Sequence, residues 1–326
     1  MKSKINDHKV LVTGGAGFIA SHLVDALVKK NAFVTVVDDL SNGRVDNVNK
    51  DARFICDSIL NTDKMRDCIK DVDLVFHLAA DTGTKETSMG FKDPFAEMTI
   101  NARGSVNILK CIMDCNPSAN IVFASSAAVY GEPKYTPVDE KHSTEPVSPY
   151  GISKLASEKY MLAYFREFGV KSIVARIFNT YGPRQSRYVI HDLIKKLSIN
   201  QDELEILGTG TTIRDYAYVS DTVGALILIA EKGKYGEIYN IAGGNPTSIE
   251  DLAKLILQKL NLIENTKIKY TGTSWKGDIT KMIADITKIR QLGYEPKINL
   301  ETGLEYTLSW FLNTSEGLAS QSSAIF

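Results

Sequence analysis

The chain has 326 residues, 44% of them hydrophobic, and its 38 Lys and Arg residues stand against 39 Asp and Glu residues for a formal net charge of −1. A near-neutral chain lacks the strong basic excess of a dedicated nucleic-acid binder or of a polybasic membrane-surface protein, so we expect neither partner. The length is sufficient for two domains and a large core, so disulfides or metals are not required for stability.

The cysteines and the N-terminal residues indicate a compartment. None of the 4 cysteines forms a CxxC pair, and no Cys or His run has the spacing of a zinc site. Free thiols in a reducing environment, and no metal, are therefore expected. The opening residues MKSKINDHK are polar and lack the apolar core of a signal peptide, and no apolar run is long enough to span a membrane. We expect a cytoplasmic protein.

The first 180 residues alternate short β-branched runs with longer stretches of helical periodicity. Strands are expected at Lys9–Val12, Phe33–Val37, Arg53–Ile55, Leu74–Leu78, Ile121–Ala124 and Ser172–Ile177. Helices are expected at Ser21–Lys29, Asn101–Met113 and Tyr150–Phe168. Strands that alternate with helices predict βαβ units and a parallel sheet, and therefore an α/β fold.

Beyond residue 180 the alternation weakens. Helices are expected at Val189–Ile199, Asp221–Glu231 and Ser248–Leu260, and strands at Leu204–Ile206 and Glu237–Ile241. Ser248 followed by Asp251 is a helix-capping signature. The Ser-rich end of the chain, residues 313–326, is expected to be a polar, loosely held tail.

The first expected strand runs directly into the residues TGGAGFIA, 13–20, and then into a helix. A dinucleotide pyrophosphate needs backbone N–H groups at a helix N-terminus and no side chain in its way. Gly14 would supply the tight turn and Gly17 the close approach, while Ala20 is small enough for the helix to pack on the strand. A glycine-containing loop without a ligand is the alternative interpretation of this segment alone.

The acidic end of the second expected strand favours the cofactor interpretation. Asp38 lies 24 positions after Gly14, about the spacing expected for a carboxylate that binds the adenosine ribose. Asp38 and Asp39 would repel the 2′-phosphate of NADP, so the pattern predicts NAD. Arg44 is near enough to leave NADP open at this point.

A Tyr and a Lys occur four residues apart in the third expected helix. That spacing places Tyr150 and Lys154 on one helix face. A free Tyr titrates near pH 10, but a nearby ammonium and an oxidised nicotinamide ring would both favour the phenolate. Ser125 and Ser126 follow the strand Ile121–Ala124, at the edge where doubly wound sheets bind ligands. An ordinary helix with a packed Tyr and an exposed Lys is the alternative.

Together these motifs resemble the extended short-chain dehydrogenase/reductase family, and within it the NAD-dependent nucleotide-sugar epimerases and dehydratases, above all UDP-glucose 4-epimerases. The matching residues, in family order between about residues 9 and 312, are TGGAGFIA (13–20), DDLSNG (38–43), Asp57, HLAA (77–80), SSAAVYG (125–131), YGISK (150–154), RIFN (176–179), YGP (181–183), IRDY (213–216) and Gly277-Asp278.

The resemblance implies a Rossmann-type doubly wound parallel sheet and a smaller C-terminal α/β substrate-binding lobe. Residues 1–178 and 215–242 would form the NAD-binding domain, and residues 179–214 and 243–312 the nucleotide-sugar-binding lobe. It also implies a homodimer, formed through the helix after Pro94 and the helix that begins near Tyr150.

The resemblance further implies a set of site residues. The catalytic residues would be Ser126, Tyr150 and Lys154. NAD would be bound by Gly14, Gly17, Phe18, Ile19, Asp38, Asp39, Asn42, Gly43, Asp57, Ser58, Leu78, Ala79, Ala80, Asn101, Ser125, Tyr150, Lys154 and Phe178. The nucleotide sugar would be bound by Ser126, Tyr150, Asn179, Arg214, Tyr216 and Asp278.

The two residues after Ser126 point to one branch of the family. Dehydratases usually carry Asp-Glu there to eliminate water, whereas Ala127 and Ala128 cannot transfer protons. We therefore expect a 4-epimerase of UDP-glucose and UDP-galactose, or of their N-acetyl forms, with Tyr150 as the base and a transient 4-keto sugar. Another nucleotide-sugar conversion is the alternative, and a non-catalytic NAD sensor a more remote one.

Two positions differ from common epimerases. Trp275 stands where an arginine usually contacts the diphosphate, so the nucleotide base stays open at this point. Met282 stands where epimerases restricted to unsubstituted hexoses often carry a bulky Tyr, and a flexible Met leaves room for an N-acetyl group.

Overall fold

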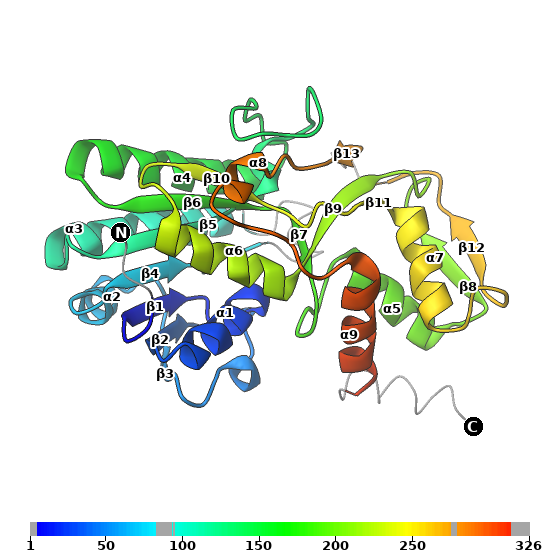
Figure 1. Cartoon of the computed structure of the whole chain (residues 1–326), viewed down its shortest axis with the longest axis horizontal. Coiled ribbons are helices and arrows are strands. Elements are labelled where there is room, and N and C mark those ends of the chain that lie inside the picture. The colour runs from blue at the N-terminus through cyan, green and yellow to red at the C-terminus, as the bar shows by residue number, and fades with distance from the viewer. Residues whose placement is uncertain (1–4, 83–92, 94, 275–278, 314–326) are drawn as a thin grey trace.

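The computed structural model describes residues 5–82, 93, 95–274 and 279–313. Seven parallel strands form the central sheet (Figure 1). In sheet order they are β10 (Ile238–Ile241), β6 (Ser172–Ile177), β5 (Asn120–Ser126), β4 (Leu74–His77), β1 (Lys9–Thr13), β2 (Phe33–Asp38) and β3 (Arg53–Cys56). This order confirms the predicted Rossmann-type sheet.

The strand order reverses between β1 and β4. From β1 the chain continues outward through β2 and β3, and it then returns to add β4, β5, β6 and β10 on the other side. Thr13 and His77, the last residues of β1 and β4, lie side by side in the register. In open α/β sheets the crevice at such a switch point, beyond the carboxyl ends of the strands, is where ligands bind.

Helices cover both faces of the sheet (Figure 1). One face packs on α1 (Phe18–Lys29) and α6 (Val219–Lys232), and the other on α2 (Thr62–Ile69), α3 (Gly104–Cys115) and α4 (Pro149–Phe168). Within β1, Val10 and Val12 belong to the first core and Leu11 to the second, as the alternation of side chains along a strand requires.

Short helical turns connect these elements. They are the 3₁₀ turns η1 (Val45–Asn47) and η3 (Ala127–Val129) and the π-helical turn η2 (Met98–Arg103), which leads into α3. All the strands and helices expected from the sequence are present, with most ends moved by a few residues. The sequence reasoning did not identify α2, whose buried side chains are only Met65 and Ile69.

A smaller group of elements follows β6 and lies at the far end of the molecule (Figure 1). β9 (Ile213–Tyr218) pairs with β7 (Asn179–Tyr181), β11 (Pro246–Ser248) and β13 (Lys281–Met282), and β8 (Glu203–Ile206) pairs with β12 (Lys267–Tyr270). The helices α5 (Val189–Ile199), α7 (Ile249–Lys259) and α9 (Leu300–Leu312) share a third core with β7, β8 and β9, whereas Met282 of β13 belongs to the first core.

The chain crosses between the two groups more than once. After β9 it returns to the large sheet, where α6 packs against α1 and β10 extends the sheet beside β6. A short helix, α8 (Thr287–Arg290), then lies near β10 before α9. The domain boundaries predicted above stay a proposal, and this path is consistent with a discontinuous division. Across the described ranges, the helices are all too short or too polar to cross a membrane.

Candidate active site

The Gly-rich turn joins β1 to α1 at the switch point. Gly14 has a φ of +73°, and a Cβ there would lie 2.7 Å from the backbone N and Cα of Ala79. Both the backbone conformation and the lack of space therefore exclude a side chain at this position. Its N–H donates to the carbonyl of Val37, which ties the turn to β2. Gly17 is the N-cap residue of α1 and has no side-chain oxygen to accept a hydrogen bond from the helix. The first N–H groups of the helix, those of Phe18 and Ile19, are therefore available to bind an anion.

The carboxylate of Asp38 supports the turn from the end of β2. It accepts the Ala16 N–H at 3.0 Å and the Leu40 N–H at 2.8 Å. Burial raises the pKa of Asp38 above its usual value, and these two hydrogen bonds oppose the rise. The backbone of Gly43 packs against this carboxylate so closely that a Cβ would lie 2.8 Å from it. Asp39 is exposed and accepts the N–H of Ser41 instead.

The remaining predicted cofactor residues lie along the same sheet edge or on its exposed rim. Asp57 follows β3, donates its N–H to the Asp38 carbonyl and accepts the Ser58 N–H. Asn42 lies on the exposed loop after β2. The segment Leu78–Ala80 follows β4, and the N–H of Leu78 reaches the carbonyl of Thr13 at 3.2 Å. Sequence motifs from four strands are thus gathered at one edge.

A buried chain of hydrogen bonds runs inward from this edge. The Ala79 N–H donates to the Thr13 hydroxyl (3.4 Å), which lies 2.8 Å from Nδ1 of His77, and Nε2 of His77 lies 2.9 Å from the Ser105 hydroxyl. Ser105 donates its only hydrogen to the Asn101 carbonyl at 2.5 Å, so it must accept from Nε2–H, and Nδ1 accepts from Thr13. Burial, with the charge of Lys154, lowers the pKa of His77 to about 3 and keeps it neutral.

Asn101 connects this chain of hydrogen bonds to α4, the helix that carries Tyr150 and Lys154. It lies in η2, is 1% exposed, and its side chain both accepts the Asp81 N–H and donates to the Asp81 carbonyl, at 2.8 Å each. Its amide also donates to the Ser153 hydroxyl at 2.9 Å, and Ser153 donates to the carbonyl of Tyr150. A cofactor contact for Asn101 stays a prediction. In the structure its side chain joins the loop after β4 to α4.

Ser126, Tyr150 and Lys154 converge at the carboxyl end of β5. Burial raises the pKa of Tyr150 above its usual value near 10, as does the neighbouring Tyr188, while a hydrogen bond with Ser126 and the charge of Arg187 oppose the rise. The Tyr150 phenol is therefore protonated at neutral pH in the ligand-free protein. The predicted lowering of its pKa by Lys154 and an oxidised nicotinamide concerns the cofactor-bound protein and stays a prediction.

Lys154 is held in an unusually apolar place for an amine. It is 2% exposed, and its Nζ lies 4.4 Å from the ring centroid of Phe123 on β5. Burial lowers the pKa of Lys154 to about 7, and the negative charge of Glu158 opposes this. At neutral pH Lys154 is thus close to the point at which it gains or loses its proton.

Two predicted residues of this edge have buried side chains. The hydroxyl of Ser125 donates to Glu158 at 2.5 Å, and Phe178 is 4% exposed with its ring 6.2 Å from that of Tyr130. Their contacts with NAD stay predictions. The sequence reasoning gave no role to Thr13, Ser105, Ser153 or Glu158, although Glu158 stands one helical turn after Lys154 and that spacing was a usable signal.

The predicted substrate residues lie on β7 and β9. Asn179 and Tyr216 are register partners, and Arg214 precedes Tyr216 on the same face of β9. Tyr216 is 2% exposed, and its hydroxyl has no hydrogen-bond partner among the described residues. An unpaired buried hydroxyl is costly, so Tyr216 is a group that a ligand would satisfy. Asp278 and Trp275 lie outside the described residues.

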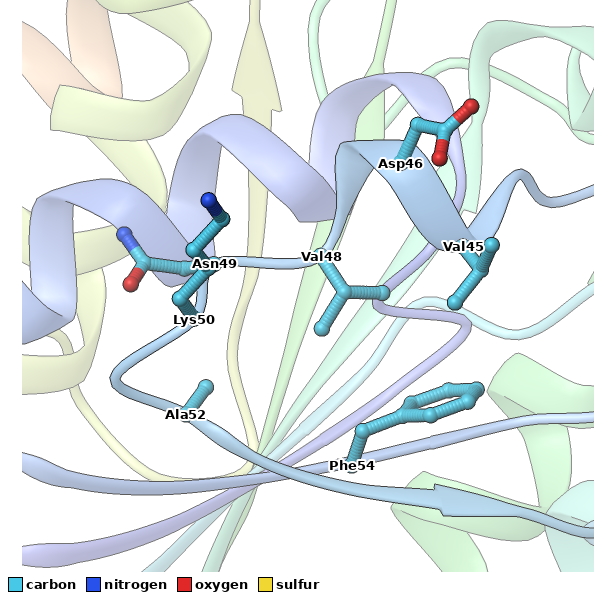
Figure 2. Close-up of a pocket in the computed structure, with 7 residues that line it drawn as sticks. All are labelled: Val45, Asp46, Val48, Asn49, Lys50, Ala52 and Phe54. Carbon is cyan, nitrogen blue, oxygen red and sulfur yellow. The ribbon is translucent and has the colours of Figure 1, made fainter.

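A surface pocket of about 410 Å³ lies elsewhere, between η1 and β3 (Figure 2). It is lined by Val45, Asp46, Val48, Asn49, Lys50, Ala52 and Phe54. None of these was predicted as a site residue, and the lining offers no proton-transferring pair like Tyr150 and Lys154. We therefore place the chemistry at the sheet edge.

Comparison with known proteins identifies the class. The model of the NAD dependent epimerase/dehydratase family matches residues 10–242. The chain belongs to this family.

Three relatives illustrate the similarity. A Methanocaldococcus jannaschii protein named as a candidate UDP-glucose 4-epimerase is 37% identical over 312 residues, which are 94% of this chain and 99% of that protein. The structure of the Thermotoga maritima UDP-glucose 4-epimerase with UDP-glucose is 36% identical and has a TM-score of 0.85, covering 93% of this chain and 98% of that one. The Bacillus cereus UDP-glucuronic acid 4-epimerase, solved with UDP-glucuronic acid and NAD, is 31% identical with a TM-score of 0.84 over the same shares.

The protein is therefore an NAD-dependent nucleotide-sugar epimerase/dehydratase family enzyme. Its own residues fit the cofactor. Gly14 leaves the backbone bare where it meets Ala79, the N-terminus of α1 has no side-chain cap, and the Asp38 carboxylate stands beside the turn. These are the features that a dinucleotide pyrophosphate and an adenosine ribose require.

Proposed function

We propose that the enzyme is a UDP-sugar 4-epimerase, acting on UDP-glucose and UDP-galactose or on their N-acetyl forms. The observation that carries this is the composition of the turn after β5. Ser126 interacts with Tyr150, and the next two residues, Ala127 and Ala128, form η3 with no proton-transferring group. An epimerase needs reversible hydride transfer and one base, and this site supplies the base.

In the proposed reaction Tyr150 and Ser126 face the 4-OH of the sugar. When bound, NAD takes up the hydride from C4 and later returns it. Tyr150, as phenolate, removes the proton from the 4-OH while C4 becomes a carbonyl, and Ser126 donates a hydrogen bond to that oxygen. The 4-keto sugar turns about its diphosphate linkage, and Tyr150 returns the proton to the oxygen of the opposite epimer. Lys154, in its charged form, stabilises the phenolate.

The diphosphate would be bound by the strands β7 and β9. Asn179 and Arg214 provide donors, and Tyr216 provides a buried hydroxyl without a partner among the described residues. The chain's net charge of −1 supplies no general attraction for a doubly charged diphosphate, so a few placed groups must hold it. The role of Asp278 stays a prediction.

One observation favours a second candidate, a nucleotide-sugar dehydratase. Glu97 precedes η2, its charge acts on Tyr150, and burial together with Asp81 raises the pKa of its carboxyl. A carboxyl group near the base is what elimination of water requires. A non-catalytic NAD sensor is disfavoured, because the Tyr–Lys pair is present, with Lys154 buried and Tyr150 hydrogen-bonded to Ser126.

The test measures the conversion of UDP-sugars in D₂O by the wild-type enzyme and by a variant of Tyr150. UDP-glucose, UDP-galactose and their N-acetyl forms are incubated with the enzyme in D₂O, and the products are followed by NMR. We expect inversion at C4 with no deuterium in the sugar, whereas dehydration would lose water and introduce deuterium. Tyr150→Phe should reduce the rate by at least about 100-fold while NAD stays bound. A Tyr150→Phe enzyme with the wild-type rate refutes the proposal.

Two further expectations belong to the proposal. A homodimer would pair α3 and α4 with those of a second copy, and the exposed side chains of Ile152 and Tyr160 on α4 support it. Sedimentation of the enzyme at two concentrations measures its mass directly. A cytoplasmic location is supported by the cysteines, all of which are free thiols in the structure.

A further inference from the structure

Glu158 is a buried carboxylate on the catalytic helix that the proposed reaction leaves without a role. It lies one turn after Lys154 on α4, and both side chains face the sheet. Glu158 is fully buried, and its partner Arg176 on β6 is 2% exposed. A buried ion pair in this position is expensive to desolvate, and it stabilises a fold less than apolar residues of the same volume would.

The Glu158 carboxylate is saturated with donors. Its Oε1 accepts the Ser125 hydroxyl at 2.5 Å and Nε of Arg176 at 3.0 Å, and its Oε2 accepts Nη2 of Arg176 at 2.8 Å. The guanidinium in turn lies 4.7 Å above the ring of Tyr130, whose hydroxyl donates to Asn240. The carboxylate is therefore fixed in place by two strands of the large sheet.

Lys154 has one negative neighbour among the described groups that act on it. On β4 it faces His77, which is neutral, and on β5 it faces the ring of Phe123. Its own helix contributes Tyr150, which is protonated in the ligand-free protein, and Glu158. The positive Arg176 on β6 stands behind Glu158. The charge of Lys154 therefore depends on Glu158.

Glu158 also contacts the end of β5, which carries Ser126, the serine of the proposed catalytic set. Ser125, which it binds, is the residue before Ser126 at the end of β5. One carboxylate thus contacts the strand end that carries the catalytic serine and lies a turn from the catalytic lysine.

We propose that Glu158 is a positioning residue for the reaction: it keeps Lys154 charged and holds the end of β5, and Arg176 serves to fix it. This rests on the role proposed for Lys154. If Glu158 had a purely structural role, its replacement would break only its pairing with Arg176 and would leave the pH dependence of the rate unchanged. If Glu158 positions the catalytic residues, its replacement would change that pH dependence.

The experiment compares three variants of the NAD-loaded enzyme between pH 6 and 9.5. Glu158→Gln keeps the shape of the side chain and removes its charge. Glu158→Gln with Arg176→Gln removes both charges, so no buried guanidinium is left unpaired. Asp114→Asn is the matched control, because Asp114 pairs with Lys110 on the surface of α3 and has the same charge.

We expect the alkaline fall in rate to move down by about one pH unit in Glu158→Gln, because Lys154 then loses its proton more easily. In the double variant it should move in the same direction but by less, because the opposing charge of Arg176 is also removed. At pH 8 the rate of Glu158→Gln should fall about tenfold relative to wild type, and at pH 6.5 the deficit should shrink to about threefold. Asp114→Asn should leave the alkaline fall in place. Where Glu158→Gln alone does not fold, the double variant carries the same comparison.

A second readout needs no substrate. In nucleotide-free protein, the advantage of Lys154→Met over wild type in urea grows as the pH falls and levels off at the folded-state pKa of Lys154. Glu158→Gln, introduced into both proteins, should lower the pH at which this levelling occurs. An unmoved pH in both readouts overturns the proposal even if stability falls. If Tyr150→Phe proves fully active, the proposed function fails, and the urea comparison still decides the effect of Glu158 on Lys154.

Discussion

Replacing Lys154, the lysine of the proposed catalytic set, should make the nucleotide-free protein more stable at neutral pH. Lys154 is 2% exposed and has a pKa lowered to about 7 by burial, whereas an unfolded chain would give it about 10.5. Between these values the unfolded state binds more protons than the folded one, so folding is penalised at low pH and the penalty disappears as the pH rises. Met has a similar volume and no charge, so Lys154→Met removes the penalty.

The size of the effect follows from the two pKa values. At about 1.36 kcal/mol for each pH unit of difference, the penalty is at most about 4 kcal/mol at pH 7. It declines to about 2 kcal/mol at pH 9 and is nearly gone at pH 10.5. The opposing loss is small, because the contact of the Lys154 amine with the Phe123 ring is worth about 1 kcal/mol and a Met side chain also packs well on a ring.

The assay is urea unfolding of wild type and Lys154→Met at pH 7, 8 and 9, on protein whose absorbance ratio shows that nucleotide has been removed. The variant should have the higher free energy of unfolding at pH 7, with an advantage that shrinks as the pH rises, and it should be inactive. A variant that is less stable at pH 7, or a difference that does not vary with pH, refutes the reasoning about the buried charge.

Two further predictions concern the cofactor and the substrate. Gly14→Ala should reduce NAD occupancy at least about tenfold, because its Cβ would displace Ala79. Gly169→Ala is the control, because Gly169 also has a positive φ but a Cβ there would meet nothing within 4 Å. Full NAD occupancy in Gly14→Ala would contradict the prediction. Tyr216→Phe should leave the free energy of unfolding unchanged or raise it by up to about 1 kcal/mol, because it removes an unpaired buried hydroxyl. The KM of this variant for the nucleotide sugar should rise. An unchanged KM would show that the hydroxyl does not contact the substrate.

The large sheet could be predicted from sequence because its signal is local. β1, β2, β5 and β6 are apolar on both faces, as buried parallel strands are, and the glycines between them mark the turns. β9 is different, because Asp215 in its middle is 0% exposed. Its carboxylate accepts the N–H groups of Asn245 and Ala284, which are 30 and 69 residues further on, so nothing in the segment itself indicates a strand.

The residues of the proposed site could be selected from the sequence, whereas the hydrogen bonds between them could not. The spacing of Tyr150 and Lys154 and the place of Ser126 after a strand are sequence properties. The contacts that position these residues depend on hydrogen bonds between residues distant in the chain, such as Asn101 and Ser153. They also depend on a π-helical turn that the sequence pattern did not predict. The pKa of Tyr150 also depends on burial, which the sequence does not supply and which raises that pKa in the ligand-free protein.

The attachment of α4 explains why these distant bonds matter. Of its six buried residues, only Met161 has a large apolar side chain, and the others are Gly151, Ser153, Lys154, Ser157 and Glu158. An apolar stripe would hold the helix with little preference for its exact rotation, whereas hydrogen bonds have a direction and a short range. Ser157 donates to the Asn101 carbonyl, and Glu158 binds two strands. Because proton transfer is sensitive to misplacement by about 1 Å, a polar attachment fixes Tyr150 more tightly than hydrophobic packing would, at a cost in stability that the rest of the fold offsets.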